Sequence, residues 1–379
     1  MRSNNGMDAP TLLGIEMCKS GSVMQPLKQV GASEMNITTI GIDLAKNLFQ
    51  IHGIDERGKA VMRKQLKRPQ MMTFFVKLPP CLIGMEACGG AHFWARKLLD
   101  LGHTVKLMAP QFVKPYVKTN KNDAADAEAI CEAVGRPNMR FVPVKSAEQQ
   151  AVLGLHRARQ GFVIARTAQV NQIRGLLTEF GLVIPQGKKS LTQHVPEILE
   201  DAENGLPGAF RQLIGRLFEH SRELDRQAKD LEAQIQADHR EDTKSQRLQR
   251  IPGIGPITAS ALVASVGDAS TFTNGRQFAA WLGLVPRQNS SGGKEKLLGI
   301  SKRGDVYLRT LLIHGARAVL RHLHRHADQA EGWLARLAAR RNPNIAAVAL
   351  ANKNARIVWA LLAHGRDYQT NYSKLAAVG

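Results

Sequence analysis

The segment Ile37-Thr38-Thr39-Ile40-Gly41-Ile42-Asp43 is rich in β-branched residues and ends in an aspartate. This composition predicts a strand, with the carboxylate of Asp43 at its end. Two more strand-like segments follow at 48–54 and 60–66, and the residues 55–58 between them form a turn. The chain therefore opens its first domain with three consecutive strands.

Helices and strands alternate after this meander. The sequence predicts a helix at 71–78, a strand at 81–86, a helix at 91–101 and a strand at 104–108. Three strands followed by helix, strand, helix and strand is the order of a ribonuclease-H-like α/β domain. Functional groups gather at strand ends in open α/β sheets, and Glu86 ends the fourth strand.

A pair of aspartates stands in the segment Asn122-Asp123-Ala124-Ala125-Asp126-Ala127-Glu128, which reads as the start of a helix. At positions i and i+3 the two carboxylates share one helix face, and like charges so close repel. A divalent cation accounts for the pair, because Mg²⁺ prefers hard oxygen ligands. The alternative is a helix N-terminus that favours acidic residues through its dipole.

Four carboxylates at element ends suggest one site. Asp43 alone could be a turn residue, and Glu86 alone could cap a helix. Together with Asp123 and Asp126 they predict a two-metal Mg²⁺ site of the kind that acts on phosphodiesters.

Composition points to a polyanionic partner. The 379 residues carry a net charge of +20, and the isoelectric point is about 10.1. From residue 282 to the end, 16 Lys and Arg face 5 Asp and Glu, so over half of the excess lies in the last quarter. No run approaches the ~18–20 apolar residues of a membrane span, and no signal peptide is evident. The spacing of the four cysteines suits a reducing cytoplasm.

The middle of the chain has helical periodicity. A helix is expected at 148–180, then a loop rich in Gly, Pro and Lys at 181–208. Apolar residues then recur every seven positions over four heptads, which predicts a coiled coil. The first seam is Phe210, Leu217, Leu224 and Leu231, and the second is Ile214, Ser221, Ala228 and Ile235. A long helix facing the core of a bundle is the alternative.

Two later segments indicate contact with phosphates. Pro252-Gly253-Ile254-Gly255 between helical segments is typical of a helix-hairpin-helix, whose backbone N–H groups face DNA phosphate, although such a hairpin also serves as a packing element. Ser290-Ser291-Gly292-Gly293 lies among basic residues, and a serine there becomes a nucleophile if it is activated. Without that context the segment would be a plain connector. Asp305 is expected to cap a helix that runs to residue 320.

In combination these segments resemble the DEDD-type insertion-sequence transposases of the IS-one-ten family, and the C-terminal part resembles the IS-eleven-eleven subgroup. The resemblance covers roughly residues 36–365. The matching motifs are Gly41-Ile42-Asp43-Leu44-Ala45-Lys46, Met85-Glu86-Ala87-Cys88-Gly89-Gly90, Lys121-Asn122-Asp123-Ala124-Ala125-Asp126-Ala127, the Pro-Gly-Ile-Gly segment, Gly283-Leu284-Val285-Pro286, Ser291-Gly292-Gly293 and Ile300-Ser301-Lys302-Arg303-Gly304-Asp305.

The resemblance implies a domain like the Holliday-junction resolvases, a coiled coil for assembly and a mainly α C-terminal domain with a catalytic serine. It implies a tetramer that cuts and rejoins donor and target DNA, guided by a non-coding bridge RNA. Asp43, Glu86, Asp123 and Asp126 would hold Mg²⁺, and Ser291 would form a covalent 5′-phosphoserine link. Ser290 is the alternative nucleophile. The residues expected to contact nucleic acid are Lys46, Lys121, Gly253, Gly255, Arg287, Lys294, Lys296, Lys302, Arg303 and Arg309.

The expected organisation has five parts. They are a mobile leader at 1–35, the DEDD domain at 36–147, helices and coiled coil at 148–245, the serine-bearing domain at 246–365 and a tail at 366–379. Two other readings stay open. One is a metal-dependent junction nuclease that uses water, and the other is a non-catalytic binder of nucleic acid. The clustered carboxylates count against the non-catalytic binder, because a protein that only binds phosphates gains nothing from clustered negative charge.

Overall fold

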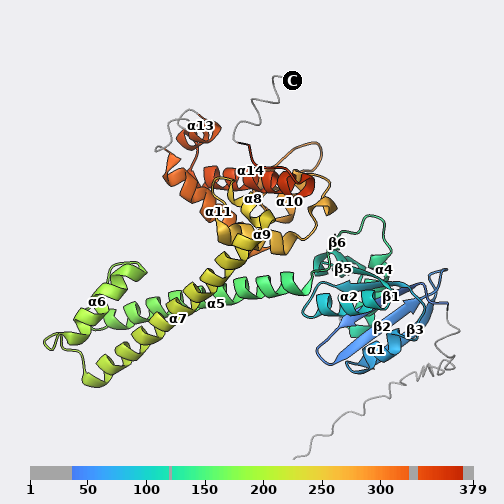
Figure 1. Ribbon diagram of the computed structural model, residues 1–379, viewed down its shortest axis with the longest axis horizontal. Coiled ribbons are helices and arrows are strands. Elements are labelled where there is room, and N and C mark those ends of the chain that lie inside the picture. Colours follow the sequence, from blue (N-terminus) through green and yellow to red (C-terminus); the bar gives the residue numbers. More distant parts are fainter. Residues whose placement is uncertain (1–35, 119–121, 324–331, 370–379) are drawn as a thin grey trace, which may run out of the picture.

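The computed structural model describes residues 36–118, 122–323 and 332–369. The expected leader, Lys121 and the end of the expected tail lie outside these residues. Figure 1 shows three parts, which are a mixed α/β domain, a long helical stalk and a mainly helical C-terminal part above the stalk. The division into an α/β domain and a helical C-terminal part confirms the expected fold class at that level.

The α/β domain is built on one six-stranded sheet, with the strand order β3-β2-β1-β4-β5-β6. β1 runs parallel to β4, and β4 runs parallel to β5, while the other pairs are antiparallel. The strands are β1 (Thr39–Leu44), β2 (Leu48–Ile54), β3 (Ala60–Lys67), β4 (Leu82–Glu86), β5 (Thr104–Met108) and β6 (Phe141–Val142).

Helices cover both faces of this sheet. They are α1 (Gln70–Phe75), α2 (Ala91–Asp100), α3 (Pro110–Val113) and α4 (Asp123–Val134), with a 3₁₀ turn at Lys114–Tyr116. The five expected strands and the helices at 71–78 and 91–101 are confirmed, although α1 ends earlier. The two-residue β6 was not expected, because such a short segment carries no periodic signal.

The stalk consists mainly of two long helices that pack on each other, α5 (Ala147–Thr178) and α7 (Gly208–Glu241) (Figure 1). Arg159 pairs with Glu232 at 2.7 Å, and Arg166 pairs with Asp225. A step of seven residues forward on α5 thus meets a step of seven residues back on α7, which is antiparallel heptad pairing. The heptads therefore find their partner within the chain, as the bundle alternative foresaw.

The seam that α7 buries is the second of the two expected ones. Its members Ile214, Ser221, Ala228 and Ile235 are buried, whereas only Leu224 of the first seam is. Hydrogen bonds from Lys188, Lys229 and Arg166 outweigh the burial of Asp225 and hold the pKa of its carboxyl well below the usual range. The expected loop at 181–208 is wrong in part, because it contains α6 (Lys188–Glu200), whose apolar face packs on the stalk.

The C-terminal part has a separate apolar core, formed by its helices around α9 and α14. Its elements are α8 (Thr243–Gln249), α9 (Pro256–Val266), a 3₁₀ turn (Ala269–Thr271), α10 (Gly275–Trp281), β7 (Pro286–Gln288), β8 (Leu297–Ile300), α11 (Val306–Arg321), α13 (Trp333–Arg340) and α14 (Pro343–His364). Asp305 caps α11 by accepting from the Leu308 N–H at 2.9 Å, as expected.

Among the described residues α14 is the one helix long and apolar enough to cross a membrane. It contributes Ala351, Ala355 and Val358 to the C-terminal core, and 44% of its apolar window is buried. Its apolarity therefore serves packing. The sequence predicts a basic helical segment that runs to about residue 362, and polar residues such as Asn352 and Lys353 interrupt its apolar run.

Buried polar contacts hold the three parts together. His156 on α5 hydrogen-bonds the Tyr307 hydroxyl at 3.0 Å and the Ser260 hydroxyl at 3.1 Å. Burial lowers the pKa of His156 to about 4, so the ring is neutral and serves as a hydrogen-bonding bridge. On the other side, Arg96 of α2 donates to the Lys145 carbonyl and to Gln150. These bonds fix both the α/β domain and the C-terminal part to the first turns of α5.

Candidate metal centre and the serine hairpin

The position of α4 depends on two glycines in the middle of the sheet. Gly41 on β1 and Gly84 on β4 are direct neighbours in the parallel register. A Cβ atom at Gly41 would lie 2.2 Å from the Ala127 carbonyl oxygen, and one at Gly84 would lie 2.7 Å from Val134 Cβ. The glycine pair thus lets α4 lie directly on the backbone of the sheet.

This packing of α4 on the two glycines brings the start of α4 to the end of β1. Side chains alternate along a strand, so Asp43 lies on the same face as Gly41, and Glu86 lies on the same face as Gly84. The sequence repeats Gly-x-acid at the ends of β1 and β4, and that repeat is the sequence signal from which the packing of α4 could have been predicted. Only the carboxylates of this repeat contributed to the predicted site.

We expect Gly41→Ala to destabilise the α/β domain and to weaken Mg²⁺ binding. The added methyl group collides with the backbone of α4, which must move away from β1 and take Asp123 with it. Such overpacking costs ~1–3 kcal/mol. Thermal unfolding and titration calorimetry with Mg²⁺ measure the two effects. Gly89→Ala is the matched control, because a Cβ there meets nothing within 4 Å. An unchanged melting temperature and an unchanged Mg²⁺ affinity in Gly41→Ala would show that the packing of α4 does not require glycine at this position.

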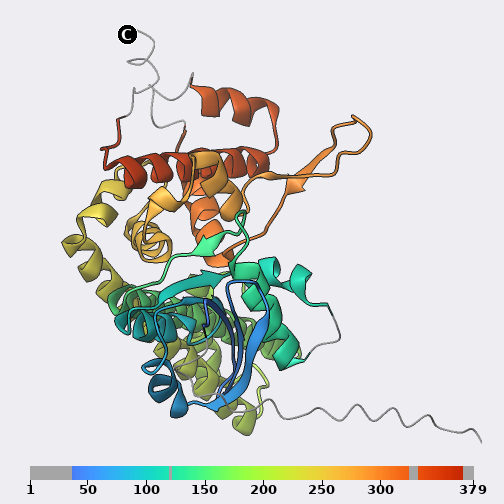
Figure 2. The ribbon, with the colours of Figure 1, turned by 90° about the vertical axis from the view of Figure 1, so that its right-hand side faces the viewer.

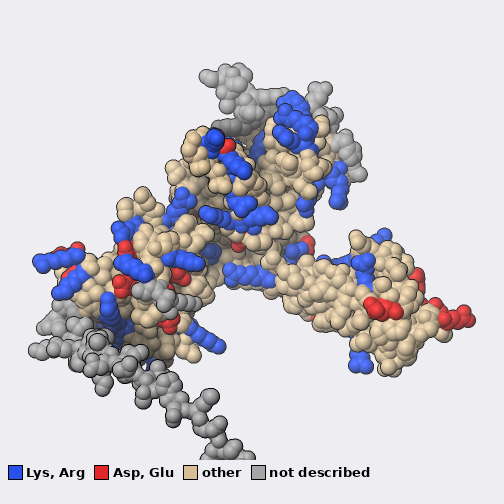
Figure 3. All heavy atoms as spheres, turned by 180° about the vertical axis from the view of Figure 1, so that it is seen from behind, with Lys and Arg blue, Asp and Glu red and all other residues tan. Residues whose placement is uncertain are grey.

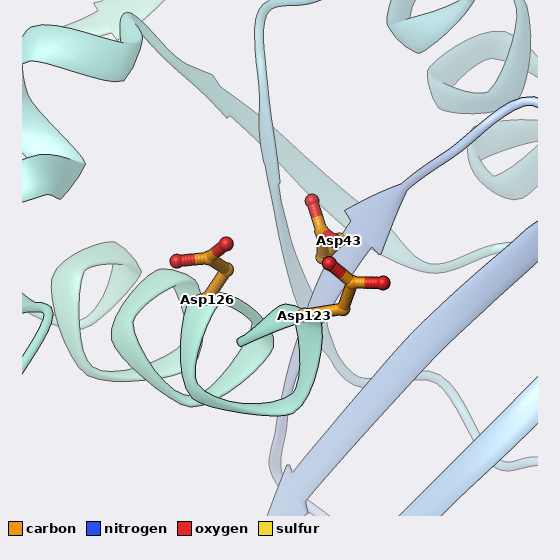
Figure 4. A group of neighbouring side chains, drawn as sticks. All are labelled: Asp43, Asp123 and Asp126. Atoms are coloured by element: carbon orange, nitrogen blue, oxygen red, sulfur yellow. The ribbon is translucent and has the colours of Figure 1, made fainter. Parts of the chain in front are cut away.

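Three of the four expected metal ligands lie together. One carboxylate oxygen each from Asp43, Asp123 and Asp126 can be chosen so that all lie within 4.8 Å of one another (Figure 4). Asp123 is exposed, and the other two are partly buried. Asn122 caps α4 by accepting from the Ala124 N–H at 3.0 Å, which starts the helix immediately before the first aspartate.

Glu86 lies beside this group of three, at the end of the neighbouring strand. Met85 pairs with Ile42 in the parallel register, so the next residues along the two strands are Glu86 and Asp43. The pKa of the nearby Cys88 thiol is raised mainly by burial, and the negative charges of Glu86 and Asp43 raise it further. The site therefore offers carboxylate oxygens, which is the donor set that Mg²⁺ prefers.

The expected serine loop is an ordered β-hairpin, formed by β7 and β8, that projects from the C-terminal part (Figure 2). Gly292 and Gly293 both have positive φ, of 56° and 77°, and the Lys294 N–H donates to the Ser291 carbonyl at 3.0 Å. This is the geometry of a two-residue hairpin turn of type I′. Ser291 therefore stands at the first position of the turn, near the tip of the hairpin.

The two serines have different surroundings. The Ser290 hydroxyl accepts from the Lys296 N–H at 3.3 Å across the hairpin. Within the described part of the chain, no hydrogen bond involves the Ser291 hydroxyl. Ser291 is thus the serine whose hydroxyl is available to a substrate.

The root of the hairpin is tightly built. A Cβ at Gly283 would lie 2.0 Å from the Arg303 carbonyl oxygen, and one at Gly304 would overlap the Trp281 carbonyl. Arg309 is buried and donates to the Leu282 carbonyl at 3.1 Å. This corrects the expectation that Arg309 contacts nucleic acid, because its guanidinium is used inside the protein to fix the hairpin root.

The other residues that are expected to contact nucleic acid differ in how exposed they are. Gly253 packs against Gly315 of α11, because a Cβ atom at Gly253 would lie 3.0 Å from the Gly315 carbonyl oxygen. A Cβ atom at Gly255 would meet no atom within 4 Å. The remaining expected basic residues within the described ranges are all exposed, namely Lys46, Arg287, Lys294, Lys296, Lys302 and Arg303. On the face of the C-terminal part that Figure 3 shows, the charged side chains are mostly Lys and Arg, with very few Asp or Glu.

The hairpin tip and the three carboxylates lie in different parts of the molecule. In Figure 2 the hairpin points away from the sheet that carries Asp43. The polar contacts around His156 and Arg96 hold this arrangement. A site that combines Ser291 with the metal centre is therefore not formed within one chain as described.

Comparison with known proteins shows which proteins this chain is similar to. Residues 40–181 match a family model described as "Transposase", and residues 245–331 match the model of the transposase IS116/IS110/IS902 family. A probable family 20 transposase of Pseudomonas aeruginosa is 57% identical over 88% of this chain and 99% of its own length. The transposase for insertion sequence element IS1111A of Coxiella burnetii is 46% identical over 93% of this chain and 98% of its own length. The transposase for IS1328 of Yersinia enterocolitica is 45% identical over 87% and 98%.

An α/β domain with a carboxylate cluster and a helical C-terminal part, both matched by transposase models, define a transposase, an enzyme that cleaves and joins DNA. The chain belongs to the IS116/IS110/IS902 family of transposases.

Proposed function

We propose that this transposase exchanges DNA strands with a ribonuclease-H-like, Mg²⁺-binding acidic centre and a serine nucleophile. The acidic centre carries the proposal, because carboxylates from β1 and α4 converge at one edge of the sheet. A protein that only binds DNA gains nothing from concentrating negative charge where phosphates approach. The strand order β3-β2-β1-β4-β5-β6 supports the relation to ribonuclease H and the junction resolvases.

In this proposal Asp43, Asp123 and Asp126 hold Mg²⁺, with Glu86 adjoining them. Bound Mg²⁺ supplies a Lewis acid that neutralises charge on the phosphate oxygens. The Ser291 Oγ attacks the scissile phosphorus, so an O–P bond forms and the bond to the 3′ oxygen breaks. The serine hydroxyl loses its proton and the departing 3′ oxygen takes up a proton, which leaves a 3′-hydroxyl and a 5′-phosphoserine link. The exposed Arg287, Lys294 and Lys296 of the hairpin hold the DNA backbone beside the serine.

The proposed active site is composite and is shared between copies of the chain. Its support is the separation of the serine hairpin from the acidic centre within one chain (Figure 2). A hairpin that projects from the body reaches a second copy, and closed symmetry repeats that contact. A tetramer that holds a donor and a target DNA is the assembly that we propose.

A metal-dependent nuclease that uses water is the second candidate function. The observation that favours it is the same separation, since the acidic centre is assembled within one chain without the serine hairpin. The two candidates differ in the covalent intermediate, which only the serine route forms.

We further propose that a structured non-coding RNA guides the enzyme, which acts in the bacterial cytoplasm. The support is the net charge of +20 and the excess of Lys and Arg after residue 282. We expect RNA from the element itself to copurify with the protein and to be required for cleavage at defined sites. Sequencing of bound RNA, and cleavage assays before and after ribonuclease treatment, measure this. Site-specific cleavage by RNA-free protein would contradict guidance by RNA and leave the metal chemistry intact.

A further inference from the structure

A large groove lies beneath the hairpin, between β8, α10, α13 and α14, with a volume of about 1370 Å³. This exceeds the ~300–1,000 Å³ of typical small-molecule pockets. Its floor is apolar and formed by residues such as Leu284, Ile300, Val348 and Ile357. The groove lies on the C-terminal part, away from the acidic centre.

The charges that line this groove within the described ranges have one sign. Arg276, Lys353 and Arg356 line it, and no described Asp or Glu does. All three cations are exposed, and none has a carboxylate partner within 4.0 Å among the described residues. Unpaired cations around an apolar floor complement a ligand that combines phosphates with apolar faces.

The groove also contains an aromatic ring and amides. Trp333 is 40% exposed, and Lys353 Nζ lies 5.0 Å from the centre of its ring. The Asn352 amide donates to the Leu284 carbonyl at 3.0 Å, which fixes its orientation in the groove wall. A fixed amide and an exposed indole are groups that recognise an unpaired base, by its edge and by its face.

We propose that this groove binds a single strand of nucleic acid, with unpaired bases on the apolar floor and phosphates on the three cations. The proposal rests on the proposed function, since strand exchange exposes unpaired strands near the hairpin. A duplex keeps the faces of its bases stacked inside the helix and would leave the apolar floor unfilled. An acidic peptide matches the charge but lacks the flat rings that fit the indole.

The test uses fluorescence anisotropy of the full-length protein with fluorescein-labelled single strands and with a duplex of the same sequence. Trp333→Ala should weaken single-strand binding about 5- to 150-fold and leave duplex binding unchanged, because loss of one base stack costs ~1–3 kcal/mol. Trp333→Phe should keep most of the affinity while reducing the quenching of tryptophan emission by the bound strand. Single-stranded DNA and RNA probes of one sequence show which sugar the groove prefers.

The charge is tested by the pair of changes Arg276→Gln and Arg356→Gln. Together they should lower the slope of log affinity against log salt by about 1.4, since each phosphate contact of a single strand contributes ~0.7. Arg340→Gln is the matched control, because Arg340 ends α13 but does not line the groove, and its slope should stay at the wild-type value.

Single-strand affinity unchanged in both Trp333→Ala and the double Arg variant would overturn the proposal. So would an equal loss of single-strand and duplex binding, or competition by polyglutamate at the level of a single strand. These failures leave the proposed function intact, because the groove variants keep the carboxylates and Ser291. Failure of the proposed function is recognised separately, by cleavage that survives loss of those residues.

Discussion

Asp126→Asn is expected to abolish Mg²⁺-dependent DNA cleavage while leaving the protein folded. Asp126 is one of three carboxylates whose oxygens lie within 4.8 Å. The amide keeps the shape of the side chain but removes a charged ligand, and loss of a single electrostatic group at a reacting centre already costs ~10²–10³ in rate. We therefore expect a fall of about 10³-fold or more for this variant, and the same for Asp123→Asn.

The stability of the variant is predicted by the same charges. Without a cation the three carboxylates repel one another, so removing one charge relieves the folded state. The melting temperature of Asp126→Asn without Mg²⁺ should therefore equal or exceed that of the wild type, and its increase on adding Mg²⁺ should be smaller.

Gel-based cleavage assays and thermal unfolding with and without Mg²⁺ measure both effects. Asp230→Asn is the matched control, since Asp230 is exposed on α7 and its contact is Arg226 at 3.8 Å. Cleavage by Asp126→Asn near the wild-type rate would remove this residue from the site.

The sequence predicted the acidic centre because each carboxylate follows a local signal. Asp43 ends a β-branched strand, and Asp123 and Asp126 follow the helix cap Asn122. What brings them together is the contact of α4 with Gly41 and Gly84. That contact joins segments over 40 residues apart, and no local preference reveals such a contact.

Heptads and charge were less informative about partners. The repeat on α7 is present, but period alone does not say whether the second helix comes from the same chain, and here it is α5. Arg309 stands in a basic segment, yet it is buried against the Leu282 carbonyl. A charged residue says nothing of its burial until the residues packed around it are known.

Ser291→Ala should still bind nucleic acid and form no covalent adduct. Its hydroxyl stands near the hairpin tip, and within the described chain no hydrogen bond involves it, whereas the Ser290 hydroxyl accepts from Lys296. Ser290→Ala loses one exposed hydrogen bond, worth about 1 kcal/mol. We therefore expect Ser290→Ala to retain at least part of the activity and to serve as the matched control. Denaturing gels of labelled DNA show the adduct as a band that protease removes.

Mixing two inactive proteins tests whether the site is shared. In an equal mixture of Ser291→Ala and Asp126→Asn chains, a shared site takes its serine from one chain and its carboxylates from another. Random assembly then restores about a quarter of the sites, since each half is intact with even odds in a symmetric assembly. A site built within one chain restores none, because every chain carries one defect.

The outcomes separate the remaining alternatives. An adduct that persists in Ser291→Ala and vanishes in Ser290→Ala transfers the nucleophile to Ser290. Free cleaved DNA without an adduct in any sample favours the nuclease that uses water. Partial activity in the mixture, with none in either protein alone, requires the hairpin of one copy to meet the acidic centre of another. The separation of the two within a single chain is the structural reason to expect that result.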